Sequence, residues 1–259
     1  MKLSERLKAV ASMVTPDNGV ADVGCDHGYL AIYLVEQGIA PFVYATDIGK
    51  GPIDHALVNI TESGYGSRIK TVLSDGLKGL TPGSCETVVM AGMGGPLMMD
   101  IMKDSPEVLE KVSELVLQPQ SEIAMVRHFL QDTGYRIISE NMVWEDEKFY
   151  PVMKAVHGSM NWDREIYFRY GKILLKERNP VLLQFLYMQK KSLSYLLSEL
   201  ESKRDEIRCQ SKEAGDPDDK STERISDRIA EVKKDIMHNA EAISLMEEKN
   251  PVEIERVLS

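Results

Sequence analysis

The chain has 259 residues, of which 43% are hydrophobic, and a formal net charge of −10. This length allows one large domain or a domain with an appendage. No apolar run approaches the roughly 20 residues that cross a bilayer, and the charged, amphipathic start over residues 1–6 is unlike a secretory signal. The widely spaced Cys25, Cys85 and Cys209 argue against a disulfide framework and a zinc site. We therefore expect a cytoplasmic protein with no metal and no membrane partner.

Short apolar segments alternate with helical ones through the first half of the chain. A helical period over residues 3–15 ends at Pro16–Gly19. The segments with strand character are Val20–Val23, Phe42–Thr46, Ile69–Leu73, Thr87–Ala91 and Leu115–Leu117. Helical stretches lie between them near residues 28–37, 51–64, 94–103 and 121–132. This alternation predicts an α/β fold with a parallel sheet that is covered on both faces.

The pattern changes after Gly134. Tyr135–Trp144 and Phe149–His157 have strand character and are joined by residues 145–148. They predict an antiparallel hairpin that closes the sheet.

Beyond Gly158 the composition becomes that of a coiled coil. Apolar residues recur every seven positions at Leu186, Leu193, Leu200 and Ile207, and a three–four spacing continues at Ile225, Ile229, Val232, Ile236 and Ile243. Gly215–Asp219 must interrupt this helical pattern. We expect a domain over residues 1–158, followed over residues 159–259 by a coiled-coil-like antiparallel helical hairpin.

The most informative motif covers residues 21–30. It predicts a buried strand ending at Val23, a glycine turn, and a helix that starts near Gly28. Asp22 and Asp26 stand where a dinucleotide site leaves room for a pyrophosphate, and Asp26 breaks the Gly-x-Gly-x-x-Gly fingerprint. Carboxylates repel phosphate but attract ammonium and sulfonium groups. The motif therefore favours S-adenosylmethionine over NAD, although Asp26 alternatively caps the helix that follows.

Further candidate groups follow the later strands. Asp47 is placed to accept ribose hydroxyls, and Asp75 is placed to meet an adenine amino group. The small residues at 91–95 let a planar base or a methyl donor lie close to the main chain, and they replace the Asn/Asp-Pro-Pro-Tyr/Phe motif of enzymes that methylate an exocyclic amine. Gln118 either bonds a base edge or is a turn residue bonded to backbone. No nucleophile–base pair is evident, and methyl transfer from a sulfonium needs none.

Charge is distributed unevenly along the chain. Residues 1–158 hold 13 Lys and Arg against 21 Asp and Glu, whereas residues 164–191 hold seven basic residues against two acidic ones. An acidic protein is a poor general partner for nucleic acid. Taken alone, the basic segment indicates a solvated helix face.

Together these motifs resemble the bacterial tRNA adenine-N1 methyltransferases of the TrmK family, which act at position 22 of tRNA. The resemblance rests on Leu3-Ser4-x-Arg6-Leu7, Ala21-Asp22-Val23-Gly24-x-Asp26-His27-x-Tyr29-Leu30, Gly51-Pro52, Asp75-Gly76-Leu77, Ala91-Gly92-Met93-Gly94-Gly95 and Leu117-Gln118-Pro119. It implies a class I, Rossmann-like methyltransferase sheet, S-adenosylmethionine as donor, and a helical tail that helps to hold tRNA. Gln120 departs from the family, in which Asn follows the proline.

On this interpretation the motifs assign candidate roles to individual residues. Asp26 is the candidate catalytic residue, because a carboxylate near the base stabilises the positive charge of the methylated ring. The expected cofactor-binding residues are Asp22, Gly24, Asp26, His27, Gly28, Tyr29, Leu30, Asp47, Ile48, Asp75, Gly76, Ala91, Gly92, Met93 and Gly94. The expected substrate-binding residues are Gly95, Gln118, Pro119, Arg164, Arg169, Lys172, Lys176 and Arg178, and the basic segment becomes a phosphate-binding face.

Other functions remain open on the sequence. A methyltransferase for another RNA site or for a small molecule shares these motifs, as does a non-catalytic protein that binds S-adenosylmethionine and acts through its helical hairpin. An NAD-dependent oxidoreductase is disfavoured by Asp26 and by the missing glycine. We expect tRNA as partner and a monomer or weak dimer.

Overall fold

The computed structural model describes residues 3–214 and 220–247. The chain divides into two compact units, with the boundary between Arg164 and Glu165, slightly later than the predicted boundary after residue 158. The predicted helix break at Gly215–Asp219 lies outside the described residues. Over the described part of the chain, no helix combines the length and apolar character needed to cross a membrane.

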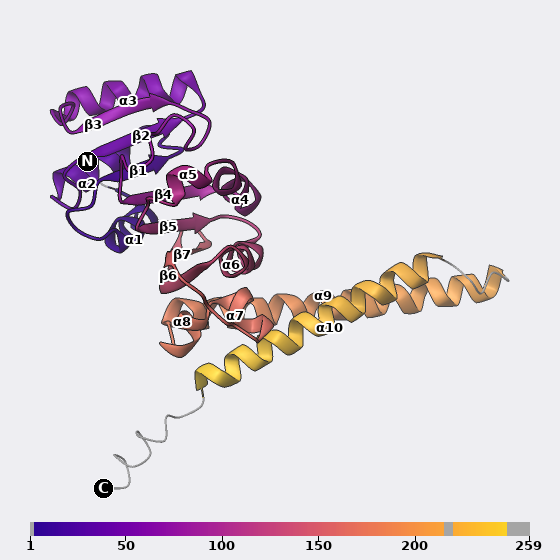
Figure 1. Cartoon of the computed structure of the whole chain (residues 1–259). Coiled ribbons are helices and arrows are strands. Elements are labelled where there is room, and N and C mark those ends of the chain that lie inside the picture. The colour runs from indigo at the N-terminus through magenta and orange to yellow at the C-terminus, as the bar shows by residue number, and fades with distance from the viewer. Residues whose placement is uncertain (1–2, 215–219, 248–259) are drawn as a thin grey trace, which may run out of the picture. The chain divides into compact units, whose positions relative to one another are not determined.

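The first unit is built on a seven-stranded sheet with the order β3-β2-β1-β4-β5-β7-β6 (Figure 1). The strands are β1 (Val20–Val23), β2 (Val43–Asp47), β3 (Ile69–Leu73), β4 (Thr87–Met93), β5 (Glu114–Pro119), β6 (Tyr135–Glu145) and β7 (Lys148–His157). The first five pair in parallel, and β7 pairs antiparallel with both β5 and β6. The predicted parallel sheet with a closing hairpin is confirmed.

Helices cover both faces of this sheet (Figure 1). They are α1 (Glu5–Met13), α2 (Tyr29–Glu36), α3 (Lys50–Ser63), α4 (Gly95–Asp104), α5 (Pro106–Leu109) and α6 (Ile123–Asp132). Apolar residues of α1, α2 and α3 form one core with strand residues such as Val89 and Val116. Helices α4 and α6 pack together. Burial of these apolar faces supplies most of the driving force for folding.

Strands β4 and β5 both run further than the sequence predicts. The pairing passes from Ala91 opposite Gln118 to Met93 opposite Pro119, and Gly92 between them has φ of +79°. Gly92 is thus the extra residue of a β-bulge, a conformation that glycine adopts without strain. The glycine-rich sequence resembles a strand end, but the partner strand keeps the ladder intact.

The β6–β7 hairpin turns through Asp146 and Glu147, which have φ of +47° and +59°. Two consecutive residues with positive φ form the tight turn whose twist suits a hairpin, here without glycine. Glu145, the last residue of β6, accepts hydrogen bonds from the backbone N–H groups of Glu5 and Arg6 at 2.7 and 3.2 Å. This carboxylate therefore ties the start of α1 to the hairpin.

At the opposite ends of the strands, Glu114 is the centre of a buried polar network. Its carboxylate accepts hydrogen bonds from the Thr15 backbone N–H, the Thr15 hydroxyl and the Thr87 hydroxyl at 2.8, 2.6 and 2.9 Å, and it lies 2.7 Å from Lys154 Nζ. Burial alone would raise the pKa of Glu114, but these partners outweigh it and hold the pKa below its usual value.

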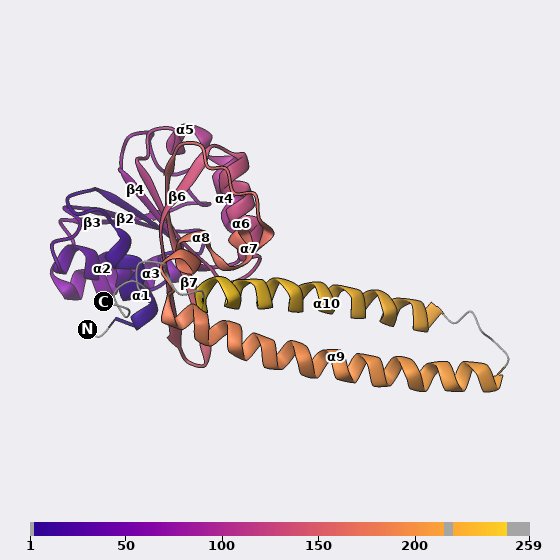
Figure 2. The ribbon, with the colours of Figure 1, turned by 90° about the horizontal axis from the view of Figure 1, so that it is seen from below.

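The second unit contains a long helical hairpin. Its elements are α7 (Glu165–Tyr170), α8 (Lys172–Lys176), α9 (Pro180–Ala214) and α10 (Lys220–Glu247). Helices α9 and α10 lie side by side in both ribbon views (Figures 1 and 2). The apolar seam between them buries Leu182, Leu186, Ile229, Val232 and Ile243. The predicted coiled-coil-like hairpin is confirmed.

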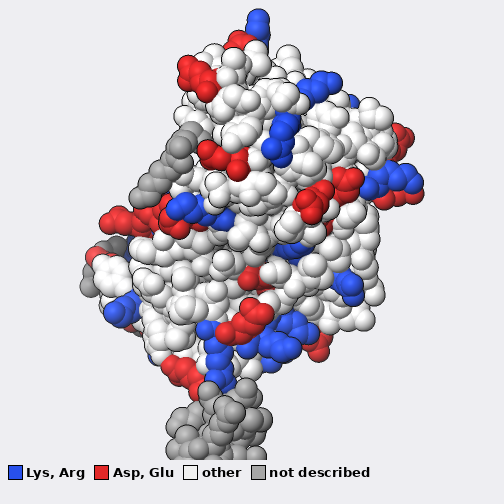
Figure 3. Space-filling view, turned by 90° about the vertical axis from the view of Figure 1, so that its left-hand side faces the viewer, with Lys and Arg blue, Asp and Glu red and all other residues white. Residues whose placement is uncertain are grey.

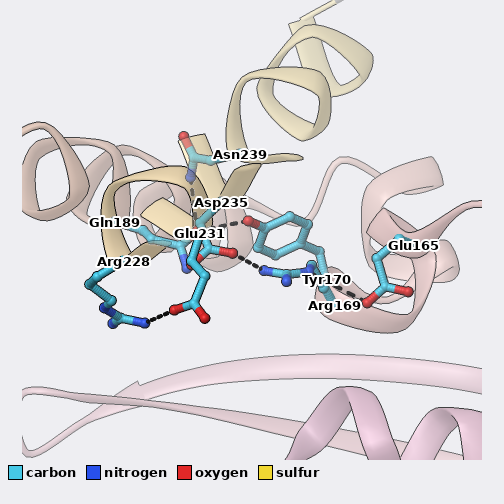
Figure 4. Close-up of polar contacts among 8 residues, drawn as sticks. All are labelled: Glu165, Arg169, Tyr170, Gln189, Arg228, Glu231, Asp235 and Asn239. Atoms are coloured by element: carbon cyan, nitrogen blue, oxygen red, sulfur yellow. Dashed lines mark hydrogen bonds and ion pairs between the residues drawn. The ribbon is translucent and has the colours of Figure 1, made fainter. Parts of the chain in front are cut away.

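One polar residue interrupts this seam (Figure 4). Asn239 is 1% exposed and donates from Nδ2 to the Leu186 carbonyl and to Gln189 Oε1 at 3.0 and 2.9 Å. The Tyr170 hydroxyl donates to the same Gln189 oxygen at 2.9 Å. Because these bonds form in one alignment of the helices, the cluster favours a single register.

Candidate active site

A cavity of about 200 Å³ opens at the carboxyl ends of β1 and β4. These strands neighbour each other where the strand order reverses direction, the place at which open α/β sheets bind ligands. The described residues that line it are Arg6, Leu7, Asp22, Gly24, Cys25, Asp26, His27, Tyr29, Leu30, Ala91, Gly92 and Gln120. The fold thus brings together the two glycine-bearing motifs that the sequence singled out.

Hydrogen bonds to neighbouring elements fix the loop after β1. The N–H groups of Gly24 and Cys25 both donate to the Thr46 carbonyl, at 2.8 and 2.9 Å, and Asn59 Nδ2 donates to the His27 carbonyl at 2.9 Å. Gly24 has φ of +76°, and a Cβ there would lie 2.9 Å from Met93 Cε. A side chain at this position would therefore crowd Met93 and strain the backbone.

Asp22 is the most unusual residue of the site. It is 4% exposed, and its Oδ2 has no hydrogen-bond partner among the described residues. Burial raises the pKa of Asp22 to about 7, and the charge of Asp47 adds to this, against a backbone hydrogen bond from Ala31. A buried, unpartnered carboxylate oxygen that lines a cavity is costly unless a ligand supplies a donor. An ammonium group satisfies this requirement.

Asp26 has a different environment. Its side chain is 70% exposed, its backbone φ is +48°, and its Oδ2 lies 3.7 Å from His27 Nε2. The alternative that Asp26 caps the next helix is wrong, because Gly28 is the N-cap of α2 and no side chain caps that helix. The carboxylate of Asp26 therefore lines the cavity and does not cap the helix.

The neighbouring strand ends carry the other expected cofactor residues. Asp47 accepts hydrogen bonds from the backbone N–H groups of Gly49 and Asp26 at 2.8 and 3.4 Å. Asp75 is ion-paired with Lys78 at 2.6 Å, a partner that the sequence alone does not indicate. Ile48, Gly76, Met93 and Gly94 are also near these strand ends and outside the cavity lining, as are Asp47 and Asp75. Because β3, β2 and β1 are adjacent and parallel, their acidic ends share one edge of the sheet.

The residues expected to meet the substrate base are buried instead. Gln118 lies within β5 with no exposed surface; its Oε1 accepts hydrogen bonds from Arg6 and from the Gly92 backbone, and its Nε2 donates to the Pro119 carbonyl. The alternative of a turn residue bonded to backbone is right about the backbone hydrogen bonds, but Gln118 lies in a strand and not in a turn. Gly95 is also buried, and a Cβ there would lie 2.6 Å from the Ser121 carbonyl.

Four of the described cavity residues were not assigned from the sequence, namely Arg6, Leu7, Cys25 and Gln120. Arg6 comes from α1, and Gln120 follows β5. Both occur in or beside the motifs that carry the family resemblance, but a lone charge on an amphipathic helix resembles a solvated residue. Only the packing of α1 across the sheet brings Arg6 to the cavity.

In the second unit, Lys172, Lys176 and Arg178 line one cavity of about 390 Å³ together with Tyr167, Leu175 and Leu245; we call these three residues the basic cluster. Lys172 Nζ lies 4.9 Å from the Tyr167 ring centre. The expected substrate residue Arg169 instead pairs with Asp235 at 2.7 Å (Figure 4), and Arg164 precedes the unit boundary.

The sheet order, the switch-point cavity and its carboxylates define a class I methyltransferase domain. Residues 3–153 match the family described as "Methyltransferase domain". A Streptococcus pneumoniae protein crystallised with S-adenosyl-L-methionine is 29% identical, with a TM-score of 0.74 over 91% of this chain and 100% of that one.

Two comparisons point to a particular family. The tRNA (adenine(22)-N(1))-methyltransferase of Bacillus subtilis is 33% identical over 193 residues, which are 71% of this chain and 79% of that protein. The crystal structure of the B. subtilis m1A22 tRNA methyltransferase TrmK has a TM-score of 0.77 at 26% identity and covers 93% of this chain and 99% of that one. The chain belongs to the TrmK family of tRNA (adenine(22)-N(1))-methyltransferases.

Proposed function

We propose that this protein transfers a methyl group from S-adenosylmethionine to N1 of adenosine 22 in tRNA. The observation that carries the proposal is the buried, unpartnered Asp22 in a cavity at the switch point of the sheet, in a chain that matches m1A22 methyltransferases over most of its length. The unpartnered oxygen calls for a cationic ligand, which a nicotinamide dinucleotide does not bring to this position.

Different residues at and near the cavity would bind different parts of the donor. S-adenosylmethionine supplies a methyl group already activated on a sulfonium, so the protein needs to position it rather than activate a leaving group. Asp22 would hold the ammonium group and Asp47 the ribose hydroxyls. The open backbone at Gly24 and Gly92 would let the donor lie against the main chain.

Asp26 is the residue we assign to the acceptor. Methylation at N1 leaves a positive charge on the adenine ring, and a carboxylate at the cavity stabilises charge that develops there. With its side chain 70% exposed, Asp26 can meet a base that enters from solvent, whereas Asp22 is buried. No general base is required, because N1 attacks through its lone pair.

We assign the basic cluster to tRNA phosphates. On the face shown in Figure 3, acidic and basic side chains are interspersed, so overall charge does not mark a nucleic-acid surface there. In the basic cluster, by contrast, three cationic side chains share one cavity with an aromatic ring, which suits phosphate and sugar contacts. A cytoplasmic location and a monomeric or weakly dimeric state stay predictions.

The proposal is tested by incubating the protein with S-adenosylmethionine and tRNA transcripts that carry adenosine or guanosine at position 22. A methyl group on N1 blocks Watson–Crick pairing, so reverse transcription should stop at position 22 of the adenosine transcript only. A stop at another position would favour the alternative of a different RNA site. Binding of S-adenosylmethionine without methylation of any transcript would favour a non-catalytic protein.

A further inference from the structure

A further cavity of the first unit lies beside the amino ends of β2 and β3. Because β1 to β5 run parallel, this is the edge of the sheet opposite the candidate active site. The cavity has a volume of about 390 Å³, a size suited to a small molecule. We call it the β2–β3 cavity; its polar and aromatic lining residues are Phe42, Tyr44, Gly66, Ser67, Arg68 and Lys70.

The strand register places two aromatic and two cationic side chains on one face of the sheet. Tyr44 pairs with Lys70 in the parallel ladder. Phe42 and Arg68 lie two positions earlier on the same two segments, and the Val43 N–H continues the pairing by donating to the Arg68 carbonyl at 2.9 Å. Since alternate residues of a strand point to the same face, these four side chains share a surface.

The two rings of this surface lie at a steep angle to each other. The ring centres of Phe42 and Tyr44 are 5.8 Å apart, and their planes make an angle of 84°. The Phe42 ring lies against Gly19, where an added Cβ would come within 2.1 Å of its Cζ, yet Phe42 is 36% exposed. An exposed ring that is held against the backbone is a surface on which a planar base stacks.

The two cations are positioned without being neutralised. Arg68 donates from Nε to the Pro41 carbonyl and from Nη2 to the Ala40 carbonyl, each at 2.9 Å. Lys70 Nζ lies 6.0 Å from the centre of the Tyr44 ring. Within residues 3–214 and 220–247, neither cation forms an ion pair. Both charges are therefore available to an anionic ligand.

The β2–β3 cavity differs in charge from the rest of its unit. Residues 1–158 hold 13 Lys and Arg against 21 Asp and Glu, but none of the described residues that line this cavity is acidic. The Glu86 carboxylate accepts a hydrogen bond from the Gly19 N–H at 2.7 Å and does not line the cavity. Two cations beside two rings complement a ligand that has a planar ring and a negative charge.

We propose that the β2–β3 cavity binds a free nucleoside monophosphate, with the base on Phe42 and the phosphate between Arg68 and Lys70. The Ser67 hydroxyl, which has no hydrogen-bond partner among the described residues, supplies a further donor to the phosphate. A single nucleotide fits better than an extended RNA, which would also meet the net negative charge of this unit. The site lies apart from the candidate active site, so the nucleotide and the methyl donor should bind together.

Isothermal calorimetry with GMP and with guanosine tests the proposal. The protein is saturated with S-adenosylhomocysteine, so that the candidate active site is occupied. Both ligands are measured with wild type, Phe42→Leu, Lys70→Gln and Lys111→Gln, and thermal melts establish that each variant is folded. Lys111 is a matched control, because it is exposed, precedes β5 at the same edge of the sheet and does not line the cavity.

We expect Lys70→Gln to weaken binding of GMP about tenfold, the loss for one hydrogen bond to a charged group, and to leave binding of guanosine unchanged. Phe42→Leu should weaken binding of both ligands about tenfold, because stacking on an aromatic ring contributes to both. Lys111→Gln should match wild type with both ligands.

Three results would overturn the inference. Wild type that does not bind GMP, or binding of GMP that Phe42→Leu and Lys70→Gln leave unchanged, would mean that the cavity is not a nucleotide site. Equal losses in Lys70→Gln and Lys111→Gln would mean that only the overall charge matters. Weaker binding of a tRNA transcript to both cavity variants, without binding of GMP, would assign the cavity to RNA. None of these measurements involves methylation, so a failed transcript assay contradicts the proposed function alone.

Discussion

Asp22→Asn should make the ligand-free protein more stable at pH 8 relative to wild type than at pH 4. Burial raises the pKa of Asp22 from 3.8 to about 7. For a carboxyl group with a raised pKa, the stabilising contribution is present below the unfolded-state pKa and is lost as pH rises through the folded-state pKa. Wild type should therefore lose stability between about pH 4 and pH 7. The Asp22→Asn variant should not show this loss, because its amide does not titrate.

The magnitude follows from the size of the shift. A difference of about three pKa units corresponds to about 4 kcal/mol, and this value is an upper bound because the neighbourhood relaxes. The Asn amide adds a pH-independent cost of about 1–3 kcal/mol, because one of its polar atoms is left without a partner. The free energy of unfolding of Asp22→Asn minus that of wild type should therefore become more positive as the pH rises from 4 to 8.

Urea unfolding followed by tryptophan fluorescence measures this difference. Both tryptophans, Trp144 and Trp162, lie in the first unit, so the signal reports on the unit that contains Asp22. Wild type and Asp22→Asn are compared at several values between pH 4 and pH 8. A difference that stays constant over this range, or a variant that loses stability relative to wild type as pH rises, would refute the reasoning.

The same residue should control binding of the donor. In wild type, S-adenosylhomocysteine should bind about tenfold more weakly for each pH unit below 7, because the ammonium group needs the ionised carboxylate. In Asp22→Asn this pH dependence should be absent and the affinity uniformly low. Binding that is independent of pH in wild type would mean that Asp22 does not hold the ammonium.

Three further predictions concern other parts of the chain. Asp26→Asn should lower kcat for tRNA methylation about 100-fold with little change in affinity for S-adenosylhomocysteine, measured by single-turnover kinetics and calorimetry; a wild-type rate would remove Asp26 from the mechanism. Reversing all three charges of the basic cluster to Glu should weaken tRNA binding at least tenfold and flatten its salt dependence without affecting the cofactor, and unchanged tRNA affinity in a filter-binding assay would contradict that assignment. Glu114→Gln should destabilise the first unit by about 3 kcal/mol at pH 7, since it leaves the part-buried Lys154 without its carboxylate partner, bonded only to the Thr15 hydroxyl among the described residues. Because the pKa of Glu114 is lowered, the stability that its carboxylate contributes is lost as pH falls through that pKa, so the difference from wild type in urea unfolding should shrink on acidification.

The sequence by itself determined the elements of the fold and the chemistry of the first loop. Alternating apolar segments gave strands and helices within a few residues of their observed bounds, and the seven-residue repeat gave the helical hairpin. Asp22, Gly24 and Asp26 could be assigned to the cavity because they lie within five residues of one another, at the end of one buried strand. Local pattern suffices for such features, since neighbours in sequence remain neighbours in the structure.

Only the tertiary structure decided which distant residues meet. The sequence predicts that Gln118 lies just beyond the end of a strand. In the structure, a β-bulge at Gly92 lets the strand pairing continue, and Gln118 is buried within β5. Arg6 reaches the cavity because α1 packs on the sheet, and Asn239 is buried because α10 aligns with α9 in one register. These contacts join residues far apart in the chain, so the hydrogen bonds and charges that define them exist only after the elements have packed.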